Sequence, residues 1–201
     1  MNAGIDEILI VIGGNNAGDF LKLLENGKYF GFKHINYTYQ QGEGGIAAAL
    51  SLAEFFADKN KIVVVLGDNI IEGNMNSAVK KFRDQKDNAR ILLKEVPDPQ
   101  RFGVPVFEGE KIIRVEEKPA DLASNFAVIG IYMYDCRVFE FIRSLKPSQR
   151  GELEITDVNN FYIREGKMQW DTLEGWWTDA GTFESLLYAG NMVEQMGTNK
   201  L

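Results

Sequence analysis

The stretch that decides the fold is Lys61–Asn69, which reads K-I-V-V-V-L-G-D-N. Its apolar run continues without a polar residue up to Gly67, and the carboxylate of Asp68 follows directly. Runs of this kind are typical of strands buried on both faces, as in a parallel sheet covered by helices. Open α/β sheets bind ligands at the carboxyl ends of their strands. Asp68 is therefore a candidate for a metal ligand, a partner of a ribose hydroxyl, or a helix cap.

The segments around this strand repeat an alternation of strand and helix. Apolar runs and apolar spacing predict strands at Glu7–Ile12, His34–Tyr39 and Lys61–Leu66, and helices at Ala17–Leu24, Ile46–Phe56 and Ser77–Gln85. The resulting order, β-α-β-α-β-α, implies a parallel sheet with right-handed crossovers.

The second half of the chain is more mixed. Its pattern predicts a β-hairpin, further strands and three helices: strands at Ala89–Val96, Val104–Phe107, Ile112–Glu116, Phe126–Tyr134 and Met168–Leu173, and helices at Arg137–Leu145, Glu154–Ile163 and Thr182–Met196. No linker separates the halves. We therefore expect a single α/β domain over residues 1–201, with a mixed, mostly parallel sheet and helices on both faces.

Composition narrows the classes of function. The 201 residues include 45% apolar and 25% charged residues, as in ordinary globular proteins. A net charge of −7 argues against a general nucleic-acid or membrane-surface binder, although it allows a nucleotide bound together with a divalent metal. The single cysteine, Cys136, excludes an intrachain disulfide and favours a reducing, cytoplasmic location. We find neither an apolar stretch long enough to span a bilayer nor a signal peptide.

Four short motifs lie at the boundaries of the expected elements. They are G-D-N at 67–69, E-E-K-P at 116–119, R-G-E-L-E-I-T-D at 150–157 and W-T-D-A-G-T at 177–182. In this order on an α/β background, the motifs are specific. The chain resembles the sugar-1-phosphate nucleotidylyltransferases, most closely the bacterial glucose-1-phosphate thymidylyltransferases, and the resemblance runs essentially from end to end.

The resemblance implies a fold and a reaction. The fold is the Rossmann-like nucleotidyltransferase fold, with a nucleotide side at about residues 1–88 and a sugar side at about residues 89–201. The reaction transfers a thymidylyl group from dTTP to glucose-1-phosphate, giving dTDP-glucose and pyrophosphate for deoxysugar and polysaccharide precursors. Relatives are commonly homo-oligomers, so the resemblance also favours a homo-oligomer.

The catalytic residues follow from the same resemblance. It implies that Asp68 and Asp179 hold Mg²⁺ and that Lys118 contacts the sugar phosphate. Both substrates are anionic, so the enzyme must neutralise charge and align the reacting groups. Two carboxylates with Mg²⁺ suit this task. The alternatives are a turn or cap for Asp68, an N-cap of the last helix for Asp179 and a solvated side chain for Lys118. Because Lys118 precedes a proline, we expect its backbone to be extended.

For the base, the resemblance assigns reading to Gln40 and packing to Gly45. A glutamine amide can pair with a pyrimidine edge through one donor and one acceptor, and glycine allows close approach of the backbone. Ala48 stands where many relatives carry a second glutamine, which leaves UTP as an alternative to dTTP. A plain β-to-α loop with a glycine turn is the structural alternative.

On the sugar side, the resemblance places Gly103, Glu117, Val128, Gly130 and Tyr132. The alternatives are sheet core for Val128 and Tyr132 and a solvated hairpin edge for Glu117. Among the three residues of this predicted strand, only Gly130 is expected to be required, because a larger side chain there would lack space. A further residue, Glu154, matches a glutamate near the sugar, but it also suits a structural capping network over residues 150–157.

One family feature has no match in this sequence. Members of the family begin with a strand and a glycine-rich loop, L-A-G-G-x-G-T-R-L-x-P-x-T, whose backbone N–H groups and basic side chains grip the triphosphate. We expect the chain to lack this strand–loop–helix unit, which would leave strand edges unpaired in the core and turnover very low. The alternatives to a thymidylyltransferase are therefore a catalytically impaired fragment, a nucleotide-sugar-binding relative, or a transferase that uses UTP or another sugar phosphate.

Overall fold

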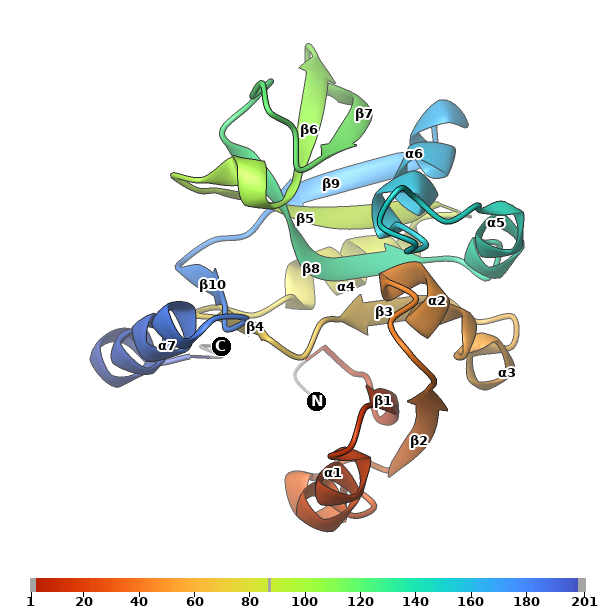
Figure 1. Cartoon of the computed structure of the whole chain (residues 1–201), viewed down its shortest axis with the longest axis vertical. Coiled ribbons are helices and arrows are strands. Elements are labelled where there is room, and N and C mark those ends of the chain that lie inside the picture. Colours follow the sequence, from red (N-terminus) through yellow and green to blue (C-terminus); the bar gives the residue numbers. More distant parts are fainter. Residues whose placement is uncertain (1–2, 87, 199–201) are drawn as a thin grey trace. The chain divides into compact units, whose positions relative to one another are not determined.

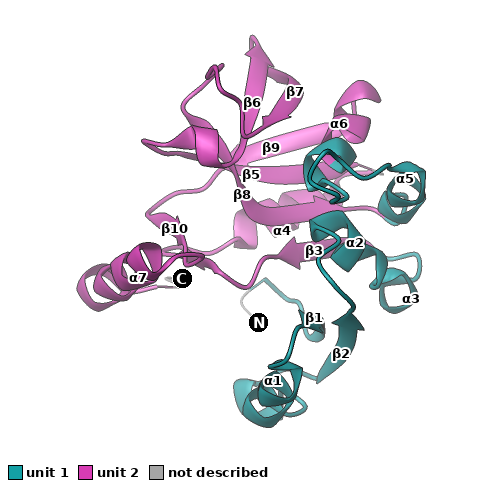
Figure 2. Ribbon diagram, in the orientation of Figure 1, with its two compact units in different colours: residues 1–60, 136–158 teal, residues 61–135, 159–201 magenta. Residues whose placement is uncertain are grey.

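The computed structural model describes residues 3–86 and 88–198, which divide into two compact units (Figures 1 and 2). Unit 1 comprises residues 1–60 and 136–158, and unit 2 comprises residues 61–135 and 159–201. Each unit combines segments from both halves of the chain. This division is structural, so the predicted single domain and its nucleotide and sugar sides stay predictions.

Unit 1 contains a β-α-β unit near the N-terminus. Strand β1 (Glu7–Gly13) pairs in parallel with β2 (His34–Gln40), and α1 (Ala17–Leu24) and the short 3₁₀ turn η1 (Lys28–Phe30) connect them. This parallel pairing confirms the pattern predicted for the first segments. The apolar run of β1 is half-buried, with Ile12 its most buried side chain.

The predicted helix Ile46–Phe56 is two helices, so that prediction was wrong in its continuity. Helix α2 (Ile46–Ser51) and helix α3 (Glu54–Ala57) are separated by a turn at Leu52 and Ala53. The backbone N–H groups of these two residues bond to carbonyls three residues earlier, which is the tighter 3₁₀ pattern. Good helix propensity along the segment did not prevent this local tightening.

Two further helices begin in unit 1. Helix α5 (Val138–Ser144) contacts α2, and its Arg143 forms an ion pair with Glu54 at 2.6 Å. Helix α6 (Ile155–Arg164) starts in unit 1 and continues into unit 2. Both lie where the sequence predicted helices.

Unit 2 is built on β8 (Phe126–Tyr134), whose residues are buried from Ala127 to Tyr134. The sheet order is β7-β6-β8-β5-β9, with β3 also paired to β8. Strand β5 pairs along one edge of β8, so β3 and β6 share its other edge at opposite ends. The remaining strands are β3 (Ile62–Val65), β5 (Ala89–Glu95), β6 (Gly103–Glu108), β7 (Lys111–Glu117) and β9 (Met168–Thr172).

The α/β class and the mixed sheet are confirmed, but the sheet is less parallel than predicted. Among the described strands, β1–β2 and β5–β9 are parallel, and the other pairings are antiparallel. The prediction that Lys61–Leu66 is buried on both faces is also wrong. Within the described residues β3 has one strand partner, and its last residue, Val65, is 48% exposed.

Two short strands connect this sheet to the last helix. Strands β4 (Asn69–Ile71) and β10 (Trp177–Asp179) pair antiparallel, and neither was predicted as a strand. Helix α7 (Phe183–Met196) follows, and helix α4 (Asn76–Asp84) lies between β4 and β5. Thr182 caps α7 in a capping box with Ser185, so the alternative that Asp179 is the N-cap is wrong. Within the described ranges, no helix is both long enough and apolar enough to cross a membrane.

The core of unit 2 contains a pair of stacked tyrosines. The rings of Tyr134 and Tyr162 lie 5.6 Å apart between centroids, and both side chains are fully buried. The Tyr134 hydroxyl donates to Asn159 Oδ1 at 2.7 Å, and the Tyr162 hydroxyl donates to Asp135 Oδ1 at 2.6 Å. Burial raises the pKa of Tyr134 well above its ordinary value.

We expect Tyr134→Phe to lower the free energy of unfolding by about 1–3 kcal/mol, because the buried Asn159 oxygen loses its donor. Urea denaturation measures this change. The control is Tyr188→Phe, at a side chain that is 49% exposed; this change should stay within about 0.5 kcal/mol. Equal stability of the two variants would contradict the assignment.

Stability should also fall at alkaline pH. An unfolded phenol ionises near about pH 10, whereas burial keeps Tyr134 neutral to higher pH in the folded state. Its contribution is therefore fully present below that pH and is lost progressively above it. Urea denaturation from about pH 8 upward should show a shallower loss in Tyr134→Phe than in the wild type, and identical slopes would refute this.

Candidate functional site

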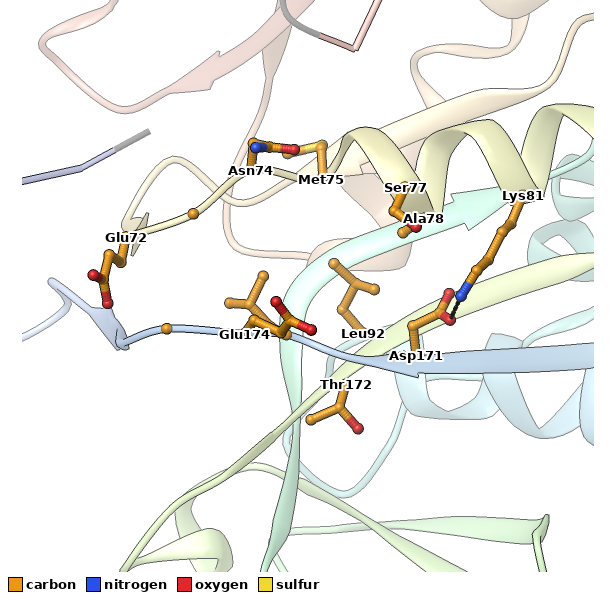
Figure 3. A pocket seen from close by; sticks show the side chains of 13 residues that line it. Glu72, Asn74, Met75, Ser77, Ala78, Lys81, Leu92, Asp171, Thr172 and Glu174 are labelled. Carbon is orange, nitrogen blue, oxygen red and sulfur yellow. Dashed lines mark hydrogen bonds and ion pairs between the residues drawn. The ribbon is translucent and has the colours of Figure 1, made fainter. Parts of the chain in front are cut away.

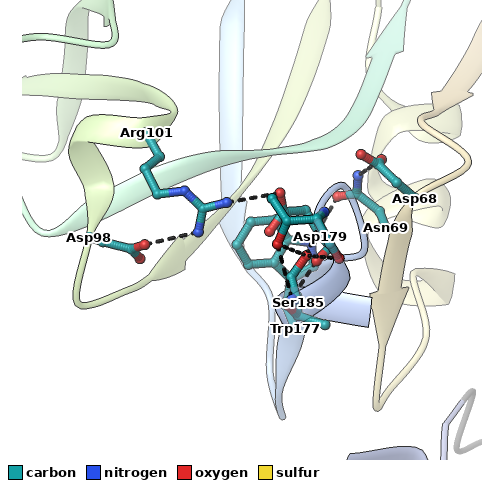
Figure 4. A network of polar contacts seen from close by, with 9 residues as sticks. Asp68, Asn69, Asp98, Arg101, Trp177, Asp179 and Ser185 are labelled. Atoms are coloured by element: carbon teal, nitrogen blue, oxygen red, sulfur yellow. Dashed lines mark hydrogen bonds and ion pairs between the residues drawn. The ribbon is translucent and has the colours of Figure 1, made fainter. Parts of the chain in front are cut away.

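The structure brings two of the predicted residues, Asp68 and Asp179, close together in unit 2 (Figure 4). Asp68 lies in the turn between β3 and β4, and Asp179 ends β10 opposite Asn69. Their carboxylates converge on Gly181: a Cβ added there would lie 3.4 Å from Asp179 Oδ2 and 3.6 Å from Asp68 Oδ2. These two oxygens can therefore be no more than 7 Å apart.

This pair fits a magnesium ion in its chemistry. Mg²⁺ prefers oxygen ligands and commonly uses one or two protein carboxylates, with water and substrate phosphates filling the other positions. In the described parts of the chain, no cluster of three or more His, Cys, Asp or Glu side chains could hold a metal. A site at Asp68 and Asp179 would thus be of the open, two-carboxylate kind.

The backbone around Asp68 supports part of its structural alternative. The N–H of Asn69 bonds to the carbonyl of Leu66 at 3.1 Å, so Asp68 is indeed a turn residue. A short strand follows it, which excludes a helix cap. The N–H of Ala180 donates to the Asp68 carbonyl at 2.8 Å and ties the two carboxylate-bearing segments together.

Arg101 supplies a positive charge to the same cluster and was not predicted. It ends the 3₁₀ turn η2 (Pro99–Arg101), and its guanidinium lies 3.2 Å from Asp179 Oδ2 and 2.9 Å from Asp98 Oδ2. The hydrogen bond to Asp98, and then the charge of Asp179, raise the pKa of Arg101. The sequence signal for Arg101 was its position in D-P-Q-R-F-G, two residues before the predicted site residue Gly103.

Asn69 joins the site to two neighbouring strands and was also missed as a functional residue. Its Oδ1 accepts from the backbone N–H of Gly130 at 2.9 Å and from the indole N–H of Trp177 at 2.8 Å. Its Nδ2 donates to Asp68 Oδ1 at 2.8 Å. The G-D-N motif contained this residue, but the local pattern could not identify its partners.

The structure explains why position 130 is glycine. A Cβ there would lie 2.4 Å from Asn69 Nδ2 and 2.9 Å from its Cγ and Oδ1. The expectation that Gly130 is required for space is confirmed, and the space is filled by Asn69. Val128 and Tyr132, on the same strand, are 6% and 5% exposed, as their sheet-core alternative requires. Their contact with a sugar stays a prediction.

Tyr132 lies within electrostatic reach of two predicted site residues. Burial raises its pKa, and the negative charges of Glu117 and Asp68 raise it further. Glu117 is the last residue of β7 and pairs with Gly103, which in turn lies opposite Val128. The five predicted sugar-side residues therefore belong to adjoining positions of three strands in unit 2.

Lys118 follows directly after β7 and is exposed. Its N–H bonds to the carbonyl of Phe102 at 3.0 Å, which continues the β6–β7 pairing by one residue. Its φ is +45°, so the prediction of an extended backbone was wrong. The left-handed conformation is strained for a residue with a Cβ, and this hairpin bond helps to hold it.

Gln40 and Gly45 lie in unit 1, at the end of β2 and before α2. Gln40 Nε2 donates to the Gly45 carbonyl at 3.4 Å, so the amide lies along the loop. Gly45 has a φ of +85°, and a Cβ there would lie 2.7 Å from the carbonyl oxygen of Leu153. The chain's own packing therefore requires glycine here, in agreement with the structural alternative. Base binding by both residues stays a prediction.

The segment before α6 is held by its own polar contacts. Arg150 forms ion pairs with Glu154 at 2.8 Å and with Glu152 at 3.4 Å, and the Ser148 hydroxyl donates to Glu154 at 2.7 Å. These contacts support the structural network proposed for residues 150–157. Placement of Glu154 near a sugar stays a prediction.

A cavity in unit 2 is not lined by the catalytic residues that were predicted. It measures about 470 Å³, lies in unit 2, and has an ion pair between Lys81 and Asp171 on its wall (Figure 3). Its lining residues are 72–75, 77, 78, 81, 92 and 171–175, and Asp68, Lys118 and Asp179 are not among them. The candidate site is therefore defined by its converging carboxylates and not by this cavity.

Comparison with known proteins places these observations in a family. The profile of the family described as nucleotidyl transferase matches residues 1–196. The chain belongs to the nucleotidyl transferase family. It is therefore a nucleotidyltransferase, and its resemblance to sugar-1-phosphate nucleotidylyltransferases is confirmed.

Individual relatives agree with this assignment. The chain is 39% identical over 198 residues to a glucose-1-phosphate thymidylyltransferase of Neisseria meningitidis serogroup A / serotype 4A, covering 96% of this chain and 68% of that protein. It is 36% identical over 200 residues to a glucose-1-phosphate thymidylyltransferase of Mycobacterium tuberculosis, covering 98% of this chain and 69% of that protein.

Solved structures support the fold. A Bacillus anthracis protein assigned as a glucose-1-phosphate thymidylyltransferase, crystallised with sucrose, is 44% identical with a TM-score of 0.92, over 98% of this chain and 80% of that one. A UDP-glucose pyrophosphorylase in complex with UDP-glucose has a TM-score of 0.82 over 96% of this chain and 83% of that one. At 21% identity this second likeness shows the fold alone.

We expect Gly130→Ala to lower the free energy of unfolding by about 1–3 kcal/mol, because the new methyl group overlaps the Asn69 side chain. The control is Gly190→Ala in α7, where a Cβ would meet nothing within 4 Å. That change should stabilise the protein by about 0.5–1 kcal/mol, since alanine favours a helix over glycine. Chemical denaturation measures both changes, and the same sign for the two would contradict the packing argument.

Proposed function

We propose that this nucleotidyltransferase transfers a thymidylyl group from dTTP to glucose-1-phosphate, giving dTDP-glucose and pyrophosphate, with Mg²⁺ as its cofactor. The product is a precursor for deoxysugar and polysaccharide synthesis. Relatives with this activity that are 36–39% identical and match nearly the whole chain support the choice of substrates. The single cysteine leads us to propose a cytoplasmic location, and the resemblance leads us to propose a homo-oligomer.

The observation that carries the proposal is the convergence of Asp68 and Asp179 on Gly181. Two like charges so close together favour a cation between them. Mg²⁺ bound there would polarise the α-phosphate and offset its charge. Arg101 contacts Asp179 and keeps part of this negative charge balanced.

The reaction needs two anions to meet in line. An oxygen of the sugar phosphate forms a bond to the α-phosphorus of dTTP while the bond from that phosphorus to the pyrophosphate oxygen breaks. We assign the approach of the sugar phosphate to Lys118, whose exposed ammonium follows β7. Glu117, beside it, would accept hydrogen bonds from the sugar hydroxyls, and Gly103, Val128, Gly130 and Tyr132 would line the sugar side.

For the base, we assign reading to Gln40 and close packing to Gly45. The Gln40 amide already bonds to the loop at 3.4 Å, a weak contact that a pyrimidine edge could replace. Ala48 carries no hydrogen-bonding side chain to add to it. Thymine and uracil present the same hydrogen-bonding edge, so discrimination between dTTP and UTP must use the thymine methyl group or the ribose 2′-hydroxyl.

A pyrophosphate-release assay with dTTP, glucose-1-phosphate and Mg²⁺ tests the proposal. Asp68→Asn and Asp179→Asn should each lower kcat by about 100-fold or more, because stabilisation by the metal is lost. The control, Asp84→Asn at the exposed end of α4, should keep wild-type turnover. Wild-type turnover in both site variants would overturn the proposal.

Calorimetry with dTDP-glucose provides a second measurement that does not depend on turnover. Binding should be observed with Mg²⁺ and should weaken in EDTA. UDP-glucose is the competitor that tests the base. Tighter binding of UDP-glucose, or faster turnover with UTP than with dTTP, would replace the thymidylyl assignment with a uridylyl one.

A further inference from the structure

We propose that Asn69 is a positioning residue that presents one oxygen of Asp68 toward Asp179. This inference rests on the proposed function, because it assumes that the two aspartates hold a metal. Asn69 itself lies beside the pair at the start of β4. Figure 4 shows its side chain between Asp68 and Trp177.

The orientation of the Asn69 amide is determined by its neighbours. Two donors, the backbone N–H of Gly130 and the indole N–H of Trp177, meet the same amide atom at 2.9 and 2.8 Å. Neither donor can accept a hydrogen bond, so this atom must be the amide oxygen. The amide nitrogen is therefore forced to the other side, toward Asp68.

This forced orientation selects between the two oxygens of Asp68. The Asn69 nitrogen donates to Asp68 Oδ1 at 2.8 Å. The second oxygen, Oδ2, lies 3.6 Å from the position that a Cβ added to Gly181 would occupy. Asp179 Oδ2 lies 3.4 Å from the same position. Asn69 thus binds one oxygen and leaves the other directed at the partner carboxylate.

Asn69 also couples the positions of the two aspartates. It follows Asp68 in the chain and is the register partner of Asp179 in the β4–β10 pair. Its carboxamide anchors this pair to β8 through Gly130, where the absent Cβ leaves room for the side chain. Loss of the amide would free both the rotation of Asp68 and the anchoring of its strand.

A matched pair of variants tests the inference. Asn160 in α6 makes a comparable set of contacts, accepting from the Val115 N–H at 2.8 Å and donating to the Val115 carbonyl at 2.9 Å. Asn69→Ala and Asn160→Ala both remove a polar bridge within unit 2. Both should lower the melting temperature, so this pair separates a structural loss from a loss at the metal site.

The measurement is Mn²⁺ binding by electron paramagnetic resonance, without substrates. Residues that orient a metal ligand typically change metal affinity by 10- to 100-fold, so Asn69→Ala should weaken Mn²⁺ binding by about tenfold. Asn160→Ala should leave it unchanged. In the activity assay, Asn69→Ala should raise the Mg²⁺ concentration required for half-maximal rate.

The outcomes separate the inference from the proposed function. Wild-type Mn²⁺ affinity in Asn69→Ala, with binding lost in Asp68→Asn, would overturn the positioning role alone. Equal weakening in Asn69→Ala and Asn160→Ala would also overturn it. No Mn²⁺ binding by the wild type, or full binding by Asp68→Asn, would overturn both the metal pair and this inference.

If Asn69→Ala does not fold, Trp177→Phe serves as the second variant. It removes one of the two donors to the Asn69 oxygen and keeps an aromatic ring against Phe102, which lies 5.2 Å away between centroids. Mn²⁺ binding should weaken by roughly threefold, because one donor remains. Unchanged affinity in this folded variant would overturn the proposal.

Discussion

The hydrogen bonds of the Asn69 carboxamide hold together the part of unit 2 on which the candidate site depends. A single oxygen accepts from β8 and from β10, and the nitrogen donates to Asp68. Partly buried polar groups that are fully satisfied in this way define a particular geometry, because any displacement leaves a donor or acceptor unpaired. Gly130 is the complement of this interaction, since a side chain at that position would occupy the same space.

The candidate site contains an unfavourable electrostatic interaction. Asp68 and Asp179 place like charges close together, and Arg101 compensates from the side of Asp179. Such an arrangement is unfavourable in isolation and is typical of positions where a protein binds a charged partner. The strained backbone of Lys118 adds a second feature of this kind at the end of β7. The paired carboxylates and the strained lysine are both consistent with the proposed binding of a metal and anionic substrates.

Strand β8 has a comparable role for the fold. Its apolar sequence identified it as a strand, and burial along nearly its whole length agrees with that pattern. The same sequence carried no information about which strands would pair with it. The structure pairs it with β3, β5 and β6, and the antiparallel direction of these contacts made the sheet less parallel than the β-α alternation suggested. An alternation of strands and helices predicts parallel pairing only where strands that are consecutive in the sequence also pair with each other in the sheet.

The sequence by itself determined most elements, their order, the family, the need for glycine at position 130 and the candidate residues Asp68, Lys118 and Asp179. These follow from periodicity, turn residues and motifs, which are local. The tertiary structure decided what depends on distant partners: the break between α2 and α3, the left-handed backbone of Lys118, and the placement of Asp179 on a short strand instead of a helix cap. It also decided that Asn69 and Arg101 join the site. Local motifs contain both residues, but their contacts arise between segments far apart in the chain, so the motifs could not specify those contacts.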